Sequence, residues 1–107
     1  MEAKELLLKA ADHMERVGHC QESYFLGIAD PEDPKRLEVP CCLLGSLRAV
    51  APEQLLDHQY LAASHALQVA IQDSTERSIC GIVAWNDYPG RTKEEAVAML
   101  RKATVHL

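Results

Sequence analysis

Apolar residues at helical spacing near the start of the chain constrain the fold more than any other feature. Charged residues fill the positions between them, so a helix here has one apolar and one polar face. The apolar positions are Ala3, Leu6, Leu7, Ala10, Met14 and Val17. Gly18 follows directly, and glycine often ends helices because it adopts positive φ at little cost. The pattern predicts an amphipathic helix over 2–17 that buries one face against other elements.

The last helix is predicted from its start signal. Thr92 and Glu95 have the spacing of a capping box, in which each side chain bonds the backbone amide of the other residue. The apolar face that follows consists of Ala96, Val97, Leu100, Ala103 and Leu107. We therefore expect a helix from Thr92 to the end of the chain, and we expect His13 and His106 at the surface of the two terminal helices.

The stretch before this helix has the residues of a tight turn. Tyr88-Pro89-Gly90-Arg91 places proline and glycine where a type II turn needs them. Asn86 and Asp87 are residue types that bond nearby backbone amides in turns. We expect Trp85 to anchor the turn in the core and Arg91 to pair with Asp87.

Three further segments complete the helical part of the prediction. The stretch 41–50 is apolar nearly all round, which indicates a central helix, and Gly45 inside it suggests close packing by a neighbouring helix. Pro52 suits the first turn of a helix that runs to about Ile71. Ser78 is a candidate cap for a short helix over 79–85, although β-branched residues there leave a strand open.

The segment from His19 to Pro40 lacks helical spacing. Residues 23–28 are short, aromatic and β-leaning, and Pro31 and Pro34 exclude a helix interior. With 107 residues the chain fits one domain. The predicted fold is mostly α: a single-domain bundle over 1–107 of four to five helices, with an irregular and partly β segment at about 19–40.

Composition limits the classes of function. The net charge of −5 argues against a general nucleic-acid binder, which needs a basic face. The sequence has no apolar run of membrane-spanning length and does not open like a signal peptide. We therefore expect a cytoplasmic protein whose four cysteines are reduced thiols. No phosphate loop or dinucleotide fingerprint is present, so no cofactor is expected.

Two readings of the turn residues remain open. As binding residues, Asn86, Asp87, Tyr88 and Arg91 would form a polar surface that recognises a partner, because exposed turns often carry function. The architectural reading, which we favour, gives the same side chains the task of holding the turn together.

The cysteines and histidines supply two alternatives. Cys42, or Cys41, at a helix N-terminus would have a lowered thiol pKa, with His65 or His58 as base and Asn86 or Asp87 to orient the imidazole. No cysteine-hydrolase signature surrounds Cys42, and buried packing is the favoured role of these thiols. A zinc site would draw on His19, Cys20, Cys41, Cys42 and Cys80. Adjacent ligands strain chelation of one tetrahedral ion, so the spacing disfavours this alternative.

The order of these features resembles a known family. An amphipathic helix is followed by Cys42-Leu43-Leu44-Gly45-Ser46-Leu47, then by Trp85-Asn86-Asp87-Tyr88-Pro89-Gly90-Arg91-Thr92, then by a capped helix. This order is similar to that of short uncharacterised proteins of bacteria and their phages with a Trp-Asn-Asp-x-x-Gly-Arg-Thr signature. The resemblance implies a bacterial or phage accessory protein, such as an inhibitor or regulator of a host system.

The leading functional hypothesis is a small non-enzymatic protein that acts by binding another protein. It rests on the lack of a strong catalytic motif and on the resemblance. The alternatives are a hydrolase or transferase that uses Cys42 with His65, and a small zinc-binding module. The apolar faces of the first and last helices also allow a homodimer.

Overall fold

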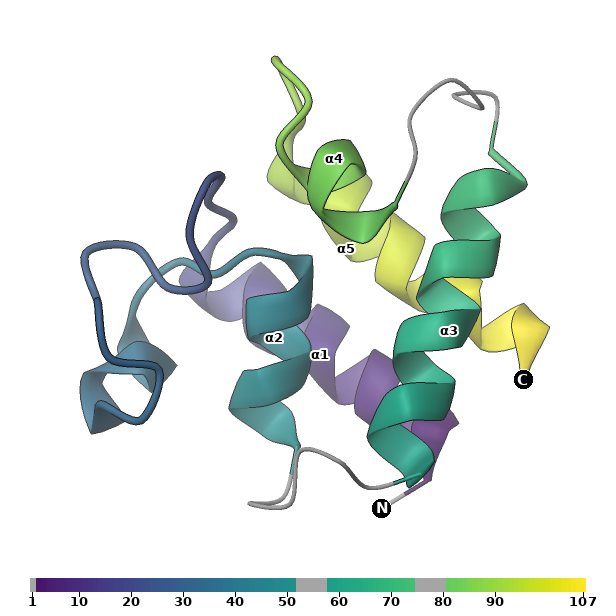
Figure 1. Cartoon of the computed structure of the whole chain (residues 1–107), viewed down its shortest axis with the longest axis horizontal. Coiled ribbons are helices and arrows are strands. Elements are labelled where there is room, and N and C mark those ends of the chain that lie inside the picture. The colour runs from purple at the N-terminus through teal and green to yellow at the C-terminus, as the bar shows by residue number, and fades with distance from the viewer. Residues whose placement is uncertain (1, 52–57, 75–80) are drawn as a thin grey trace.

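Helix α1 (Ala3–Val17) is the element on which the rest of the fold is assembled. The computed structural model describes residues 2–51, 58–74 and 81–107. Helices α2 (Leu43–Val50), α3 (His58–Gln72) and α5 (Lys93–Lys102) all contact α1 (Figure 1). Helix α4 (Ile82–Asn86) lies over α2 and α3, and no strand is present in the described ranges. The predicted mostly α single-domain bundle is confirmed, and the regular structure of the described residues is entirely helical.

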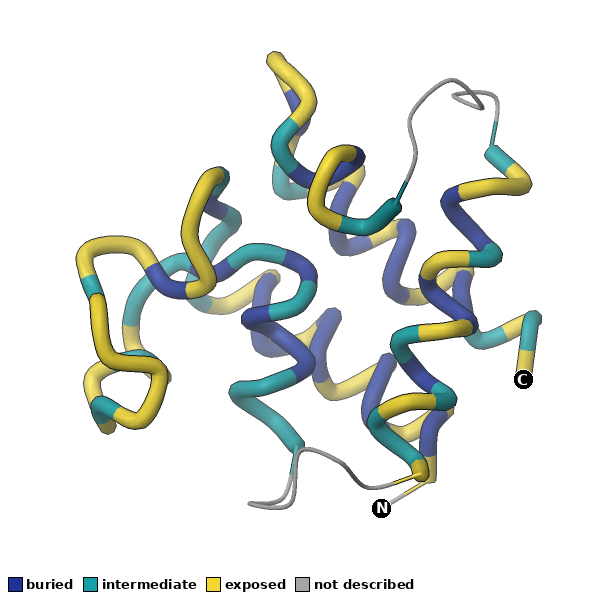
Figure 2. Tube along the Cα trace, viewed as in Figure 1, coloured by how far each residue is buried: buried dark blue, intermediate teal, exposed yellow. Residues whose placement is uncertain are grey.

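The apolar face of α1 is buried as predicted. Leu6, Leu7, Ala10 and Met14 are fully enclosed by the surrounding helices. The helix ends where expected, because Gly18 has a φ of 106° and its N–H donates to the Met14 carbonyl at 2.7 Å. Figure 2 shows buried segments along the inner sides of α1, α2, α3 and α5, where the single core lies.

One side chain on α1 departs from the prediction. His13 is buried instead of lying at the surface. Its Nδ1 atom is 3.1 Å from Nη2 of Arg16, and its Nε2 atom is buried without a hydrogen-bond partner. Burial and the Arg16 guanidinium both lower the pKa of His13.

The capping box of α5 is present in full. Glu95 N donates to Thr92 Oγ1 at 3.1 Å, and Thr92 N donates to Glu95 Oε1 at 2.9 Å. The helix is shorter than predicted, since the chain tightens into a 3₁₀ turn, η2 (Ala103–His106). A final tight turn of this kind is common because it satisfies carbonyls at a helix end.

The middle helices follow the prediction with shifted boundaries. Helix α2 begins at Leu43, with Cys42 as its N-cap and Cys41 outside it. The predicted start of the third helix at Pro52 lies outside the described residues, and α3 ends at Gln72. The helical alternative is confirmed for α4, whereas the proposed Ser78 cap lies outside the described residues.

The segment 19–40 is irregular, as predicted. Its β character is limited to two isolated bridges, both to Cys41: a parallel one from His19 and an antiparallel one from Phe25. A short 3₁₀ turn, η1 (Pro34–Glu38), begins at one of the two prolines and is capped by the Asp33 side chain. No described helix combines the length and the hydropathy that crossing a bilayer requires.

Gly45 explains how this segment fits against α2. A Cβ atom at this position would overlap the backbone carbonyl oxygen of Tyr24. The prediction that a neighbouring helix requires this glycine is therefore wrong: the close neighbour is the backbone of the irregular segment. Glycine at position 45 lets that backbone lie directly on α2.

Candidate functional site

Asn86 joins three segments that are distant in sequence. Its Oδ1 atom accepts a hydrogen bond from Leu43 N at 3.0 Å and lies 2.9 Å from His19 Nε2. Its Nδ2 atom donates to Cys20 O at 3.1 Å and to Asp87 Oδ1 at 2.9 Å. Because Oδ1 can only accept, His19 must carry a proton on Nε2. Asn86 is itself buried, so the end of α4, the start of α2 and the segment after α1 are held as one unit.

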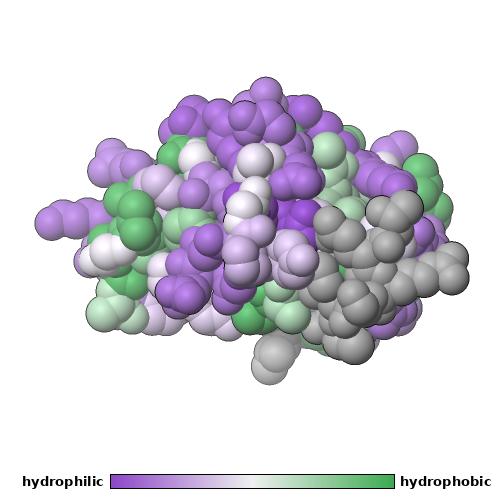
Figure 3. All heavy atoms as spheres, turned by 90° about the horizontal axis from the view of Figure 1, so that it is seen from above, coloured by the Kyte–Doolittle hydropathy of each residue, from purple (hydrophilic) through white to green (hydrophobic). Residues whose placement is uncertain are grey.

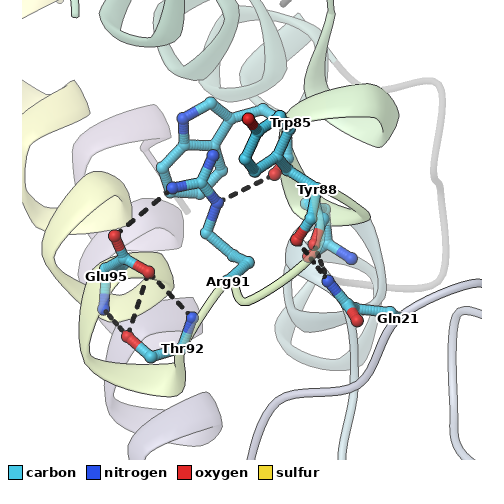
Figure 4. Close-up of polar contacts among 7 residues, drawn as sticks. Gln21, Trp85, Tyr88, Arg91, Thr92 and Glu95 are labelled. Carbon is cyan, nitrogen blue, oxygen red and sulfur yellow. Dashed lines mark hydrogen bonds and ion pairs between the residues drawn. The ribbon is translucent and has the colours of Figure 1, made fainter. Parts of the chain in front are cut away.

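The loop after Cys20 is held against the turn by side-chain contacts. Glu22 N donates to Asp87 Oδ1 at 2.9 Å, and Glu22 has a φ of 68°. Gln21 Nε2 donates to the carbonyl oxygens of Asn86 and Tyr88, at 3.2 Å and 2.8 Å (Figure 4). The turn residues therefore position a second loop as well as their own.

Arg91 holds the turn itself. Its guanidinium stacks over the Trp85 ring with 3.6 Å from Cζ to the ring centroid, and its Nε donates to the Trp85 carbonyl at 2.9 Å. Its Nη1 is 3.4 Å from Glu95 Oε2 (Figure 4). The predicted pairing of Arg91 with Asp87 is wrong, because Asp87 instead binds Glu22 and Asn86. Trp85 anchors the turn in the core as predicted, with only 3% of its surface exposed.

The turn also has the predicted backbone form. Arg91 N donates to Tyr88 O at 3.0 Å, and Gly90 has a φ of 87°, as position three of a type II turn requires. Of the four predicted binding residues, Asn86 and Arg91 are buried in contacts within the chain. Asp87 is half-buried and Tyr88 is half-exposed, so these two remain accessible to a partner.

A groove opens beside this turn. Residues 22–24 form one wall, α4 with its C-cap Asp87 forms the other, and the start of α2 forms the floor. Its lining residues, which define the α4 groove, are Glu22, Ser23, Tyr24, Cys42, Leu44, Ile82, Val83, Asn86 and Asp87. Its volume is about 300 Å³. The lining is largely apolar, with two carboxylates, which is the usual composition of a binding site.

Hydrophilic residues predominate on the face that Figure 3 shows, and apolar residues on that face occur in separate small areas. A large continuous apolar patch would be typical of an obligate interface. The part of that face drawn in colour therefore lacks an apolar patch of that size.

Cys42 lies on the floor of the groove and caps α2. Its Sγ atom accepts a hydrogen bond from Gly45 N at 3.2 Å. Burial is the largest effect on this thiol and raises its pKa, against the opposing hydrogen bonds from Gly45 and Leu44. The predicted lowering of the Cys42 pKa by the helix N-terminus is therefore outweighed by burial.

The predicted catalytic partners of Cys42 are only partly brought together. Asn86 lines the same groove, but its side chain bonds His19 and Leu43. His58 and His65 lie exposed on α3, and neither is among the described lining residues of the groove. No described contact connects either histidine to Cys42.

The predicted zinc ligands can be followed in part. Cys41 is fully buried, and burial together with the neighbouring Cys42 and Cys20 raises its pKa to about 12. Within residues 2–51, 58–74 and 81–107, no group of three or more His, Cys, Asp or Glu side chains is arranged to hold a metal ion. Cys80 lies outside the described residues.

Sequence reasoning missed the groove residues that come from outside the turn. Glu22 carries no local motif, and the sequence places Tyr24 only in a β-leaning stretch. Val83 was interpreted as a structural residue of a short helix, yet 59% of its surface is exposed. The groove exists because two distant segments meet, and no local pattern in either segment signals that meeting.

The comparisons with known proteins give a family but no activity. No curated protein and no solved structure matches the chain. A family of unknown function, DUF6197, matches residues 1–106, a range that includes the helices, the turn and the groove described above. The chain is therefore a member of the DUF6197 family.

Proposed function

We propose that the protein acts without catalysis, by binding a protein partner that inserts an apolar side chain into the α4 groove. Basic residues of the partner next to that side chain meet the carboxylates of Glu22 and Asp87. The observation that carries the proposal is the groove itself, with its apolar walls and acidic lining.

The size and walls of the groove support a side-chain anchor. A volume of about 300 Å³ stands at the small end of ligand pockets, which suits one large side chain better than a whole cofactor. Tyr24 and Val83 flank the groove with 42% and 59% of their surfaces exposed. Exposed apolar side chains on both sides of a cavity shield an inserted apolar side chain from water, which favours binding.

Charge supports a basic partner segment. Glu22 is exposed, Asp87 is half-buried, and the chain carries a net charge of −5. The positive charge of Arg48, whose Cζ atom lies 4.7 Å from the centroid of the Tyr24 ring, disfavours a basic residue of the partner on that side of the groove. Complementary charge around an apolar anchor chiefly supplies specificity and a faster encounter.

The geometry gives the cysteine-hydrolase alternative less support. Cys42 has a raised pKa, and the described lining of the groove includes no histidine that would serve as its base. A groove that binds a basic segment without chemistry also suits an accessory protein that regulates another protein by covering that segment.

Titration of isotope-labelled protein with short peptides tests the proposal. The probe is acetyl-Lys-Lys-Leu-Lys-Lys-amide, and the matched peptides replace every Lys with Glu or the Leu with Gly. We expect amide shifts around Ser23, Val83 and Asp87 with the first peptide and smaller shifts with both others. Shifts that map away from the groove, or equal shifts with the Gly peptide, would contradict the proposal.

A pair of substitutions provides the control. Val83→Glu places a charge in the wall of the groove, whereas Val105→Glu changes a residue on η2 that is 73% exposed. The first variant should weaken peptide binding at least tenfold, and the second should bind like the wild type. Equal binding by both variants would place the interaction outside the groove.

A further inference from the structure

The backbone brings Cys20 close to Cys42, and Cys42 lies at the floor of the α4 groove. His19 and Cys41 form a parallel bridge, in which Cys20 N donates to Cys41 O at 3.0 Å and Cys41 N donates to Gly18 O at 3.1 Å. Cys20 and Cys42 directly follow the two bridged residues, and Cys42 keeps extended backbone although it is not itself bridged to Cys20. Paired residues on parallel strands project to the same side, since side chains alternate along each strand.

The spacing of such a pair suits a disulfide. Neighbouring strands lie about 4.8 Å apart, and disulfides join Cα atoms about 4.4–6.8 Å apart. The same surroundings act on both thiols: burial is the main reason that the pKa of each is raised, Asp87 raises both further, and Cys20 also raises the pKa of Cys42. Both cysteines are free thiols in this structure.

We propose that Cys20 and Cys42 form a disulfide in the presence of a peroxide, and that this bond alters the α4 groove. The effect on partner binding rests on the function proposed above, whereas the bond itself does not. Cys42 is the entry point, because it lines the groove and is only half-buried. Cys20 is the resolving thiol, 93% buried beside it.

The chemistry balances with hydrogen peroxide as the oxidant. The Cys42 thiolate attacks one peroxide oxygen, the O–O bond breaks, and the hydroxide that leaves takes the thiol proton to become water. The Cys20 sulfur then attacks the resulting sulfenic acid, the S–S bond forms, and the S–O bond breaks to release a second water. Two thiols are thereby oxidised and one peroxide is reduced to two waters.

The bond would change two present contacts of the groove. Cys42 Sγ now accepts from Gly45 N at 3.2 Å, and Cys20 Sγ now donates to Ser23 O at 3.4 Å. Turning both sulfurs toward one another releases the α2 cap and the loop wall at Ser23. Burial raises the pKa of both thiols, so the thiolate is scarce at neutral pH and oxidation should accelerate as pH rises.

Peptide mapping after peroxide treatment tests the bond. Lys35 and Arg36 lie between Cys20 and Cys41, so trypsin places Cys20 on one peptide and the Cys41–Cys42 pair on another. We expect a loss of about 2 Da, the mass of two hydrogens, and a linked peptide whose fragments join Cys20 to Cys42. A Cys80→Ser variant should give the same link, because the fourth thiol has no part in it. A link through Cys41 or Cys80, or sulfinic acid at Cys42 with no link, would overturn the proposal.

Amide shifts test the effect on the groove without any partner. Oxidation should move the Gly45 and Ser23 signals, and dithiothreitol should restore them; a linked protein with unmoved signals would overturn the groove effect. Oxidised protein should also bind acetyl-Lys-Lys-Leu-Lys-Lys-amide at least fivefold more weakly than reduced protein. Failure of the reduced protein to bind that peptide would count against the proposed function alone, because the linked peptide and the Gly45 shift decide the disulfide independently.

Discussion

The side chain of Asn86 accepts a hydrogen bond from the backbone amide of Leu43, 3.0 Å away, at the first residue of α2. Amides at a helix start have no partner within the helix, so they need one from elsewhere. The end of α4 supplies it, while Cys42 Sγ satisfies Gly45 N. The short helix of the turn and the helix at the floor of the groove are thus fixed relative to each other.

Replacing Asn86 should lower the free energy of unfolding. Asn86→Ala leaves Leu43 N and Cys20 O buried without their partner, and each such group costs about 1–3 kcal/mol. We expect the free energy of unfolding to fall by about 3 kcal/mol in urea melts. Asn86→Asp should also destabilise, because it directs a carboxylate oxygen at the Cys20 carbonyl. Wild-type stability in both variants would show that Asn86 is dispensable.

Arg91 should not be replaceable by lysine. The planar guanidinium both stacks on Trp85 and donates Nε–H to its carbonyl, and an ammonium group matches neither contact. Arg91→Lys should lose about 1–2 kcal/mol of stability, nearly as much as Arg91→Ala. Trp85 is the only tryptophan in the chain, so its fluorescence should shift to the red as its cover is lost. Full rescue by lysine would mean that charge alone matters.

Gly45→Ala should reverse the usual effect of alanine in a helix. Alanine ordinarily stabilises a helix interior by about 0.5–1 kcal/mol relative to glycine. At position 45 the added methyl group meets the Tyr24 carbonyl oxygen, which belongs to the wall of the groove. We expect a net loss of about 1–3 kcal/mol by thermal melting. A stabilised variant would refute the close approach of this loop to α2.

Stability should depend on pH through His13. Its folded pKa is lowered below the ordinary 6.5, mainly by burial, so the unfolded chain binds the proton more readily. The contribution of neutral His13 is therefore present above about pH 6.5 and lost as pH falls from there toward the folded pKa. Melting temperatures measured from pH 8 to pH 5 should fall less steeply for His13→Gln than for the wild type. Parallel curves would exclude His13 as the cause.

The elements that the sequence predicted well are those with local signals. The apolar spacing of α1 and the Thr92–Glu95 capping box each depend on residues within a few positions of one another. The type II turn at Pro89-Gly90 belongs to the same class, because its backbone form is decided by two adjacent residues. Such signals survive folding because they do not depend on which distant segment packs nearby.

The features that escaped prediction depend on distant contacts or on a balance of forces. The Asp87 carboxylate and the Trp85 ring lie at similar sequence distances from Arg91. Only the packing of the folded turn places the guanidinium over the Trp85 ring. Gly45 faces a loop carbonyl instead of a helix because segment 19–40 returns across α2. For Cys42, the helix N-terminus and burial act on the pKa in opposite directions, and the extent of burial is a property of the whole fold.

The two bridges at Cys41 have a consequence for how the irregular segment opens. Four backbone amides take part in the hydrogen bonds around these bridges, and they are those of Cys20, Leu26, Cys41 and Cys42. They donate to the carbonyl oxygens of Cys41, Pro40, Gly18 and Tyr24, respectively. None of their hydrogen bonds belongs to a helix or to a sheet, yet breaking one separates the segments that form the others. Their hydrogen exchange should therefore occur at a common rate, as a cooperative unit. A segment with almost no regular secondary structure would then open as a single body, and the wall of the groove would move with it.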